Sequence, residues 1–448
     1  SDSQECRDFV KAAFDLSEEF DTPVIVRMST RVAHSQSSVE LFDREEKALK
    51  EYTKNPQKYV MMPAFAKVRH DFVEERTKKL IAYSETSSLN KTEINDTKIG
   101  VITSGISYQY AKDTLGDTVS YLKLGIVNPL PVDLIKDFCK KFDIVYVIEE
   151  LDGIIEEHCK VIGINNVKGK EIFGYIGELS QSIIAEKLLN KTSEFTAFSE
   201  NVPMRPPVLC AGCPHRGVFY ALSKNKITVS GDIGCYTLGA VAPLNAMDTT
   251  ICMGASISAL HGFNKVRGIE SEKNSVAVIG DSTFMHSGIT GLVNIAYNST
   301  NSTVIILDNS ITGMTGHQQN PTTGYNLKGD PAAKVCLEDL CKAVGINRVR
   351  VVDPYKLSET EAAIKEEVLV DEPSVIISRR PCALLKYVKH NAPLSVDKDK
   401  CTGCKACLKI GCPAISIKDK KSVINHTQCV GCGICQELCR FDAIGGNE

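Results

Sequence analysis

The stretch that decides the fold lies at residues 276–319 and reads VAVIGDSTFMHSGITGLVNIAYNSTNSTVIILDNSITGMTGHQQ. It opens with an apolar run, Val276 to Ile279. A second apolar run, Val304 to Leu307, follows an amphipathic stretch. Short apolar runs on either side of an amphipathic segment predict a strand, a helix and a second strand. We therefore predict an α/β domain built on a mostly parallel sheet.

Polar residues follow both predicted strands. Gly280-Asp281-Ser282 comes after the first, and Asp308-Asn309 comes after the second. In an open parallel sheet the carboxyl edge binds ligands, so Asp281 and Asn309 are expected to be neighbours there. A carboxylate and an amide oxygen suit Mg²⁺, Gly280 permits close backbone approach, and the following helix offers free N–H groups to a diphosphate. The alternative is an ordinary strand–helix–strand unit whose Asp and Asn only cap turns.

The pattern resembles the thiamine diphosphate motif, in which Gly-Asp-Gly is followed after a similar interval by Asn. Ser282 replaces the third glycine, a departure that the ferredoxin-linked 2-oxoacid oxidoreductases tolerate. The resemblance implies that thiamine diphosphate binds here. It also implies that Asp281 and Asn309 hold Mg²⁺ through their side chains and Ile311 through its backbone oxygen.

A glycine-rich segment precedes this motif and begins with Met253-Gly254-Ala255-Ser256. Small side chains at these positions would let a flat cofactor ring pack against a helix, so Met253 and Gly254 are candidate cofactor-binding residues. The same small side chains would equally let a helix pack closely on a sheet.

Composition limits the class of protein. The 448 residues correspond to about three domains, and the formal net charge of −3 favours neither nucleic acid nor an anionic membrane surface as a partner. We find no apolar run long enough to span a bilayer and no export signal, and we expect a cytoplasmic location. The 18 cysteines then indicate metal binding or catalysis, in place of disulfides.

The amino-terminal part does not form a complete domain pattern. Residues 1–35 contain one expected helix, Ser3 to Phe20, and one expected buried strand, Pro23 to Met28. Residues 36–95 are highly charged, contain an expected helix from about Ala66 to Ser84, and are predicted to form a connector.

Three further domains are predicted along the chain. Residues 96–192 alternate strands and helices and resemble the transketolase carboxyl-terminal domain. A polar, proline-containing linker at 193–207 leads to a thiamine diphosphate and Mg²⁺-binding domain at 200–392. Residues 396–448 are expected to form a ferredoxin-like α+β domain.

Eight cysteines of the carboxyl-terminal segment form two repeats. Each has three cysteines at Cys-x2-Cys-x2-Cys spacing followed by a lone cysteine, as in proteins that hold two [4Fe–4S] clusters, where the fourth ligand comes from the other motif. Zinc fingers instead favour paired Cys-x2-Cys units. The predicted ligands are Cys401, Cys404, Cys407 and Cys439 for the first cluster and Cys412, Cys429, Cys432 and Cys435 for the second.

Four other cysteines could hold a third [4Fe–4S] cluster, because related pyruvate oxidoreductases bind one beside thiamine diphosphate with cysteines in the same order. Here Pro214-His215-Arg216 follows the Cys-x2-Cys pair, where those enzymes usually have Gly-Glu. The alternative is a set of structural thiols, with or without one redox-active cysteine. The four are Cys210, Cys213, Cys235 and Cys382. The remaining cysteines are predicted to be core residues, namely Cys6, Cys139, Cys159, Cys252, Cys336 and Cys341.

Thiamine chemistry on a 2-oxoacid produces a strong reductant, and iron–sulfur clusters accept electrons singly. Together they describe a 2-oxoacid:ferredoxin oxidoreductase. The order of the parts resembles the alpha subunits of indolepyruvate ferredoxin oxidoreductases, over essentially the whole chain. This resemblance implies arylpyruvate substrates, coenzyme A as acyl acceptor, ferredoxin as electron acceptor, a smaller beta subunit and a hetero-oligomer.

The resemblance also implies that residues 1–35 are the remnant of a pyrimidine-binding domain, whose missing part would hold the glutamate that activates thiamine. The chain alone is then expected to be catalytically incomplete, with His317 and His215 as weak catalytic candidates. Two alternatives stay open. One is a related enzyme for pyruvate or another small oxoacid, and the other is a non-catalytic electron-transfer subunit.

Overall fold

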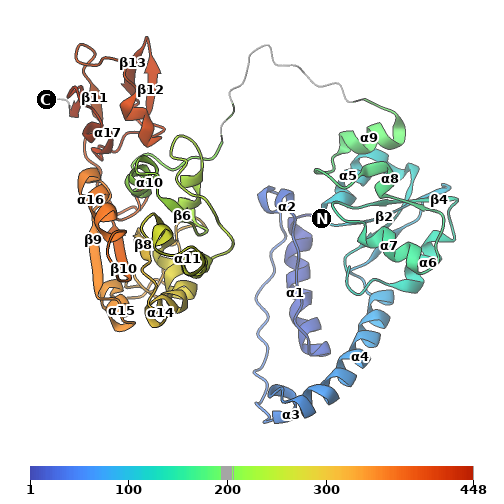
Figure 1. Ribbon diagram of the computed structural model, residues 1–448. Coiled ribbons are helices and arrows are strands. Elements are labelled where there is room, and N and C mark those ends of the chain that lie inside the picture. The colour runs from blue at the N-terminus through green and yellow to red at the C-terminus, as the bar shows by residue number, and fades with distance from the viewer. Residues whose placement is uncertain (193–203, 205, 447–448) are drawn as a thin grey trace. The chain divides into compact units, whose positions relative to one another are not determined.

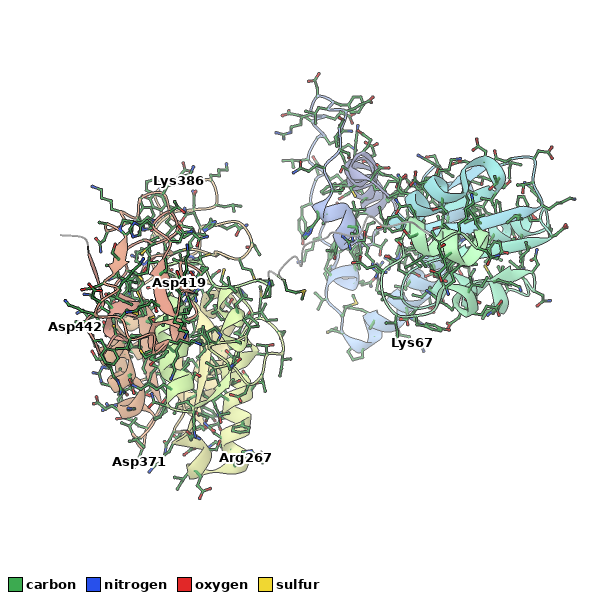
Figure 2. The ribbon with its side chains drawn as sticks, turned by 90° about the horizontal axis from the view of Figure 1, so that it is seen from above. Lys67, Arg267, Asp371, Lys386, Asp419 and Asp442 are labelled. Atoms are coloured by element: carbon green, nitrogen blue, oxygen red, sulfur yellow. The ribbon has the colours of Figure 1, made fainter. Side chains whose placement is uncertain are left out.

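The computed structural model describes residues 1–192, 204 and 206–446. The chain divides into two compact units, Ser1–Asn201 and Val202–Glu448 (Figure 1). Most of the linker predicted at 193–207 lies outside the described residues. None of the described helices is both long and apolar enough to cross a membrane. Charged side chains such as Lys67, Arg267 and Asp371 are exposed on the outside of their units (Figure 2).

The first unit is built on a five-stranded sheet in the order β1-β3-β2-β4-β5. All neighbours are parallel except β1, an antiparallel edge strand within the segment predicted as a connector. Its residues, Lys91–Glu93, are polar and lack the apolar pattern that would reveal a strand. The other strands are β2 (Ile99–Ser104), β3 (Ser120–Leu124), β4 (Ile144–Ile148) and β5 (Val167–Lys168).

Helices cover this sheet and precede it (Figure 1). The predicted helices at 3–20 and 66–84 are confirmed, the second with longer bounds. The α-helices are α1 (Ser3–Phe20), α2 (Thr30–His34), α3 (Pro56–Tyr59), α4 (Pro63–Thr86), α5 (Ile106–Leu115), α6 (Val132–Cys139), α7 (Ile154–Val161), α8 (Lys170–Phe173) and α9 (Gln181–Leu189), and η1 (Gly116–Thr118) is a 3-10 turn.

The strand predicted at Pro23 to Met28 is wrong. This segment has no strand pairing in the described structure, and Ile25 is 90% exposed. An apolar run becomes a strand only where its backbone N–H and C=O groups meet a neighbouring strand, and this segment meets none among the described residues.

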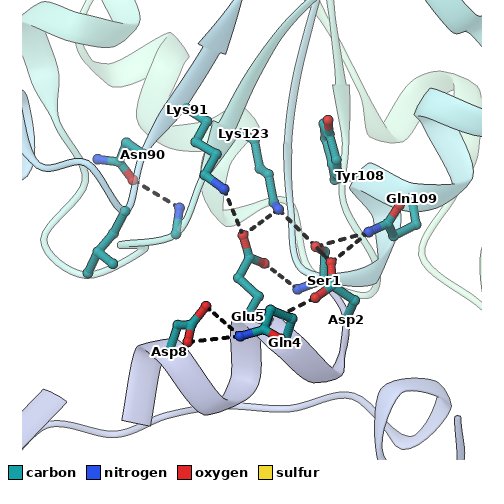
Figure 3. A network of polar contacts seen from close by, with 12 residues as sticks. Ser1, Asp2, Gln4, Glu5, Asp8, Asn90, Lys91, Tyr108, Gln109 and Lys123 are labelled. Carbon is teal, nitrogen blue, oxygen red and sulfur yellow. Dashed lines mark hydrogen bonds and ion pairs between the residues drawn. The ribbon is translucent and has the colours of Figure 1, made fainter. Parts of the chain in front are cut away.

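A buried ion pair holds α1 against β3 (Figure 3). The Lys123 ammonium lies 2.5 Å from Glu5 Oε1, and both residues are less than 10% exposed. Lys123 also donates to Ser1 Oγ at 2.8 Å, and Gln109 donates to Asp2. These long-range polar contacts fix the amino-terminal helix on a sheet about one hundred residues away in the sequence.

The second unit contains the predicted parallel sheet, in the order β6-β7-β8-β10-β9. Alternate residues of one strand reach opposite cores, because Val276 and Val278 of β7 join one cluster whereas Ala277 and Ile279 join the other. Helices therefore cover both faces, which explains why the strands are apolar throughout. The strands are β6 (Thr228–Ser230), β7 (Ser275–Gly280), β8 (Thr303–Asp308), β9 (Arg348–Val352) and β10 (Ser374–Arg379).

The helices of this sheet domain lie between its strands in sequence. The helix predicted after Gly280 begins at Asp281 and includes a π-helical turn before it continues. The segments are α10 (His215–Lys224), η2 (Cys235–Ala240), α11 (Ala255–Arg267), α12 (Ile269–Glu272), α13 (Asp281–Thr283), η3 (Phe284–Gly288), α14 (Ile289–Tyr297), α15 (Leu337–Ala343) and α16 (Leu357–Glu367).

The carboxyl-terminal segment folds as two antiparallel strand pairs joined by cysteine-bearing loops. Its apolar core also contains Leu357, with Tyr220 and Tyr355 packed against it, so this domain packs on the parallel-sheet domain. The elements are β11 (Leu394–Val396), η4 (Ala406–Ile410), β12 (Ile415–Lys418), β13 (Lys421–Ile424), α17 (Ile434–Glu437) and β14 (Ile444–Gly446).

One capping interaction gives a test of the first unit. Glu85, at the end of α4, accepts hydrogen bonds from the N–H groups of Val132, Asp133 and Leu134 at 2.6, 3.0 and 2.7 Å. These are free amides of the first turn of α6, which a carboxylate satisfies and stabilises. We expect Glu85→Ala to lower the free energy of unfolding by about 1–2 kcal/mol in denaturant titrations.

Glu75→Ala on the same helix is the matched control, because Glu75 is exposed and its one ion pair among the described residues is with Lys78. We expect this substitution to leave the unfolding midpoint unchanged, as exposed ion pairs contribute little. Equal effects of the two substitutions would contradict the capping role of Glu85.

Candidate cofactor and cluster sites

The candidate residues of the second unit gather at the carboxyl edge of the parallel sheet. Asp281 follows β7, Asn309 follows β8 and Cys382 comes shortly after β10. Strands β7 and β8 pair in parallel, with Gly280 opposite Leu307, and this register brings the two motif loops together. Thr312 Oγ1 donates to Ser282 Oγ at 2.8 Å and joins the loops directly.

Asp281 is a buried carboxylate, only 2% exposed. It accepts from the Ser282 N–H at 2.8 Å, and Asn320 and Thr322 each donate to it at 3.3 Å. No basic side chain among the described residues pairs with it. Burial raises the pKa of Asp281 to about 7, and the neighbouring Asp308 carboxylate adds to this rise. A cation bound at this carboxylate would remove the cost of its burial.

Asn309 is also buried and lies between the motif and a cysteine. Its backbone oxygen accepts from the Cys382 N–H at 2.9 Å, and its side-chain nitrogen lies 3.5 Å from His215 Nε2. Ile311, two residues later, is buried, and its N–H donates to Asn309 Oδ1 at 3.3 Å. A carboxylate, an amide oxygen and a backbone oxygen are a donor set that fits Mg²⁺.

The two histidine candidates lie in different environments. Burial lowers the pKa of His215 to about 4, so its imidazole is neutral near pH 7 and contacts Asn309 as a positioning group. His317 is exposed, has a positive φ of 65°, and lies with Nε2 4.0 Å from Cys382 Sγ. Neither environment resembles that of a paired acid and base.

Asp232 is a site residue that the sequence reasoning missed. It follows β6, is fully buried, and accepts from the N–H groups of Gly254 at 2.8 Å and Ser256 at 3.2 Å. Gly254 has a φ of 90°, and a side-chain carbon there would lie 2.3 Å from Ser287 Cβ, so glycine is needed at this position for backbone reasons. Gly231-Asp232 repeats the Gly280-Asp281 pattern, and this repetition was the available signal. Asn320 and Thr322 were missed because they lie in an irregular loop without periodicity.

The Cys-x2-Cys pair, Cys210 and Cys213, lies next to the sheet edge that carries Asp281 and Asn309. The pKa of Cys213 is raised to about 12, mainly by burial; the neighbouring Cys210 and Cys382 thiols contribute to the rise, whereas the His215 N–H and the Arg216 charge oppose it. The pKa of Cys235 is likewise raised, first by burial and then by Cys382 and Cys210. A side-chain carbon at Gly313 would lie 3.5 Å from Cys235 Sγ, which places this thiol against the loop after Asn309. The thiols of the proposed third cluster thus lie near enough to affect one another's pKa, and Cys235 and Cys382 lie beside the loop that begins at Asn309.

The eight tail cysteines line two separate cavities, with four cysteines in each. One is lined by Cys401, Cys404, Cys407 and Cys439, and the other by Cys412, Cys429, Cys432 and Cys435. Backbone N–H groups of Ala443 and Leu394 donate to the Cys439 and Cys429 sulfurs at 3.3 and 3.4 Å.

Within residues 1–192 and 206–446, no three His, Cys, Asp or Glu side chains converge as the ligands of a single metal ion. In each tail cavity the four thiols instead line a shared space, which suits a cubane cluster held at its corners.

The second cavity has a wall that belongs to the parallel-sheet domain. Ala211 and Gly212, between the two cysteines of the Cys-x2-Cys pair, line it together with Cys412 and Cys432. Gly212 has a φ of 67°, and a side-chain carbon there would lie 2.1 Å from Val430 Cγ2. The proposed third and second cluster sites are therefore separated by the thickness of one loop.

The prediction that the remaining cysteines are core residues holds for Cys139, Cys159 and Cys341, which are buried. It is wrong for Cys252 and Cys336, which are exposed, and Cys6 is only partly buried. Cys252 and Cys336 lie in segments just before α11 and α15, where no helical or strand period indicates which side chains face the core.

Comparison with known proteins follows these sites along the chain. Residues 232–378 match the C-terminal TPP-binding domain of thiamine pyrophosphate enzymes, and residues 393–440 match the 4Fe-4S dicluster domain. The indolepyruvate oxidoreductase subunit IorA of Pyrococcus horikoshii is 37% identical over 99% of this chain and 76% of its own length. The chain belongs to the IorA family.

Other relatives agree with this assignment. The IorA subunit of Archaeoglobus fulgidus is 36% identical over 99% of this chain and 75% of its own length. The 2-oxoglutarate synthase subunit KorB of the same organism is 26% identical over 42% of this chain and 78% of its own. Membership of the IorA family identifies this chain as a subunit of an oxidoreductase with a thiamine pyrophosphate domain and iron–sulfur clusters.

The buried carboxyl of Asp281 generates a test that combines stability and binding. Its pKa is raised from 3.8 to about 7, so ionisation destabilises the cofactor-free fold as pH rises towards 7 and fully above it. We expect Asp281→Asn to stabilise that fold above pH 7 by on the order of 4 kcal/mol, a difference that shrinks as the pH falls and vanishes below about pH 4. The same substitution should abolish Mg²⁺-dependent binding of thiamine diphosphate.

Calorimetric titration with thiamine diphosphate and Mg²⁺ measures the binding, and denaturant unfolding at pH 5 and pH 8 measures the stability. Wild-type affinity should fall as the pH drops below about 7, because a proton then competes with the metal for Asp281. Asp371→Asn, which changes an exposed carboxylate of the same unit, is the control. Normal binding by Asp281→Asn would remove Asp281 from the proposed metal site.

Proposed function

We propose that this chain, together with a smaller beta subunit, catalyses the oxidative decarboxylation of arylpyruvates such as indolepyruvate. Coenzyme A takes the acyl group, carbon dioxide leaves, and electrons pass through iron–sulfur clusters to ferredoxin. The proposal rests on one observation. In the second unit, the loop Cys210 to Cys213 lies beside the sheet edge that carries the thiamine-type motif, and the same loop lines a cavity of the [4Fe–4S] type. The IorA relatives supply the substrate class.

The chain's own residues have distinct proposed tasks. Asp281, Asn309 and the Ile311 backbone oxygen would hold Mg²⁺, and His215 would orient the Asn309 amide. Bound there, the Mg²⁺ would anchor the diphosphate of thiamine, whose ring supplies the carbon that reacts with the 2-oxoacid. Asp232 would stabilise this edge of the sheet, because its carboxylate accepts hydrogen bonds from N–H groups at the start of α11.

The cysteine groups define a route for single electrons. The proposed third cluster, beside Asn309, is the group nearest the motif, and its Ala211-Gly212 wall borders the second cluster cavity. Residues of both tail cavities belong to one apolar core, which keeps the first and second cluster sites close together. Of the first group, Cys404 is exposed, so this site offers the outlet to a soluble electron acceptor.

The substrate is tested with the purified complex of this chain and its beta subunit. A panel of 2-oxoacids with coenzyme A should reduce ferredoxin or viologen fastest with indolepyruvate and other arylpyruvates. Pyruvate turning over faster than every arylpyruvate would contradict the proposed substrate class. Failure of every 2-oxoacid in the presence of bound thiamine diphosphate would favour a non-catalytic electron-transfer subunit.

The third cluster is tested by anaerobic iron and sulfide analysis. We expect about twelve irons per chain, because three cubanes each contribute four. Cys235→Ala should reduce the content towards about eight, since it removes a ligand from the group beside Asn309 and none from the tail. Cys336→Ala, an exposed cysteine away from all three groups, is the control and should leave iron unchanged. About eight irons in the wild-type chain would remove the third cluster.

A further inference from the structure

Arg216 is a buried cation without an acidic partner. It is 2% exposed, and its guanidinium forms no ion pair with any carboxylate of the described residues. The two other arginines of this region differ, because Arg379 pairs with Asp308 and Glu338, and Arg380 pairs with Asp353. Burial of a charge is costly unless an opposite charge lies nearby. The location of Arg216 therefore requires an anion that the side chains around it do not supply.

The guanidinium donates to four backbone oxygens in two loops. On one side it bonds the Cys210 oxygen at 3.0 Å and the Leu209 oxygen. On the other side it bonds the Ile410 oxygen at 3.0 Å and the Gly411 oxygen at 2.5 Å. The first pair of carbonyls begins the Cys-x2-Cys loop, and the second immediately precedes Cys412.

Arg216 thus lies between the thiols of two proposed clusters. Cys210 and Cys213 belong to the third group, and Cys412 lines the second cavity, whose wall includes the Cys-x2-Cys loop. Burial lowers the pKa of Arg216, whereas negative charge on Cys412, Cys213 and Cys210 raises it. A cubane held by four thiolates is an anion, and its reduction adds further negative charge. Such a pair of anions is the compensation that this buried cation lacks.

We propose that Arg216 is the shared counter-ion of the second and third iron–sulfur clusters, where it raises both reduction potentials while it ties their loops together. This role rests on the proposed cluster assignment. A nearby positive charge favours the reduced form of an anionic cluster, so the net charge around it tunes its potential. Because one guanidinium serves both sites, it shifts both potentials in the same direction.

Arginine suits this position better than lysine. Its planar fork can donate to four carbonyls while the charge is retained, whereas an ammonium has three donors around one point. Arg216→Lys therefore keeps the charge and weakens the tie between the loops. Arg216→Gln removes the charge and keeps a polar group that can still donate to a carbonyl. The two variants separate the electrostatic role from the structural one.

The test is an EPR-monitored redox titration of the purified complex, with chemical reductant and no 2-oxoacid, after iron and sulfide analysis. In Arg216→Gln we expect the equilibrium constant for adding one electron to fall about tenfold at the second and third clusters, a shift of about 59 mV to more negative potential. The first cluster should change less. Arg216 contacts the end of η4 at Ile410, three residues after Cys407, whereas the thiols whose charge acts on Arg216 are Cys412, Cys213, Cys210 and Cys432, which belong to the second and third groups. Arg216→Lys should keep potentials near those of the wild type.

The double variant Asp353→Asn, Arg380→Gln is the matched control. It removes an arginine that packs over Tyr355, whose hydroxyl donates to Gly212 of the same loop, but it removes the paired carboxylate as well. No net charge changes, so both potentials should stay unchanged. Equal potentials in Arg216→Gln and the wild type, with clusters retained, would overturn the proposal.

Loss of clusters is also informative. Loss of clusters in Arg216→Gln but not in Arg216→Lys supports a need for the charge. Equal loss of clusters in both variants, or equal shifts of potential in both, would mean that Arg216 only ties the two loops together, and would overturn the proposal. Failure of the substrate panel would not affect this result, because the titration uses no 2-oxoacid. Should the third group hold no cluster, a shift confined to the second cluster would overturn the shared role.

Discussion

The parallel register between β7 and β8 is the constraint on which the proposed site depends. It places Gly280 opposite Leu307, so that the loops carrying Asp281 and Asn309 leave the sheet side by side. Both strands are buried on both faces, and a slip of one residue would exchange the two apolar cores that Val276 and Ala277 separately enter. Packing of the sheet therefore determines the geometry of its edge.

Asp281 and Arg216 are both buried in this unit, and neither has an oppositely charged side chain beside it in the part of the chain that the structure describes. Asp281 has hydrogen bonds but no cation, and Arg216 has carbonyl oxygens but no carboxylate. A folded protein retains such groups at a cost in stability, which is offset when a ligand of opposite charge binds. The carboxylate lies where the proposed Mg²⁺ would bind, and the guanidinium lies between two proposed anionic clusters.

Short loops join the proposed Mg²⁺ site to the proposed cluster sites of this unit. The Cys382 N–H bonds the Asn309 backbone, and Gly212 closes the wall of the second cavity against Val430. Asn309 is thus in direct contact with a cysteine of the proposed third cluster. The loop that carries two other cysteines of that group also lines the cavity of the second cluster. The proximity of these groups, more than any single contact, makes the relay of single electrons physically reasonable.

The sequence by itself determined the parts that repeat or have a period. Apolar runs located β7 and β8, and the spacing of the two cysteine triplets agrees with the division of the tail thiols between two cavities, because spacing along a short chain limits which residues can meet. It failed at Pro23 to Met28, where an apolar run found no strand to pair with, and at the polar edge strand Lys91–Glu93. Only the tertiary structure decided that Asn320 and Arg216 belong to these sites, since their partners come from loops distant in sequence. Burial and long-range contacts, which leave no local pattern, are the physical reason.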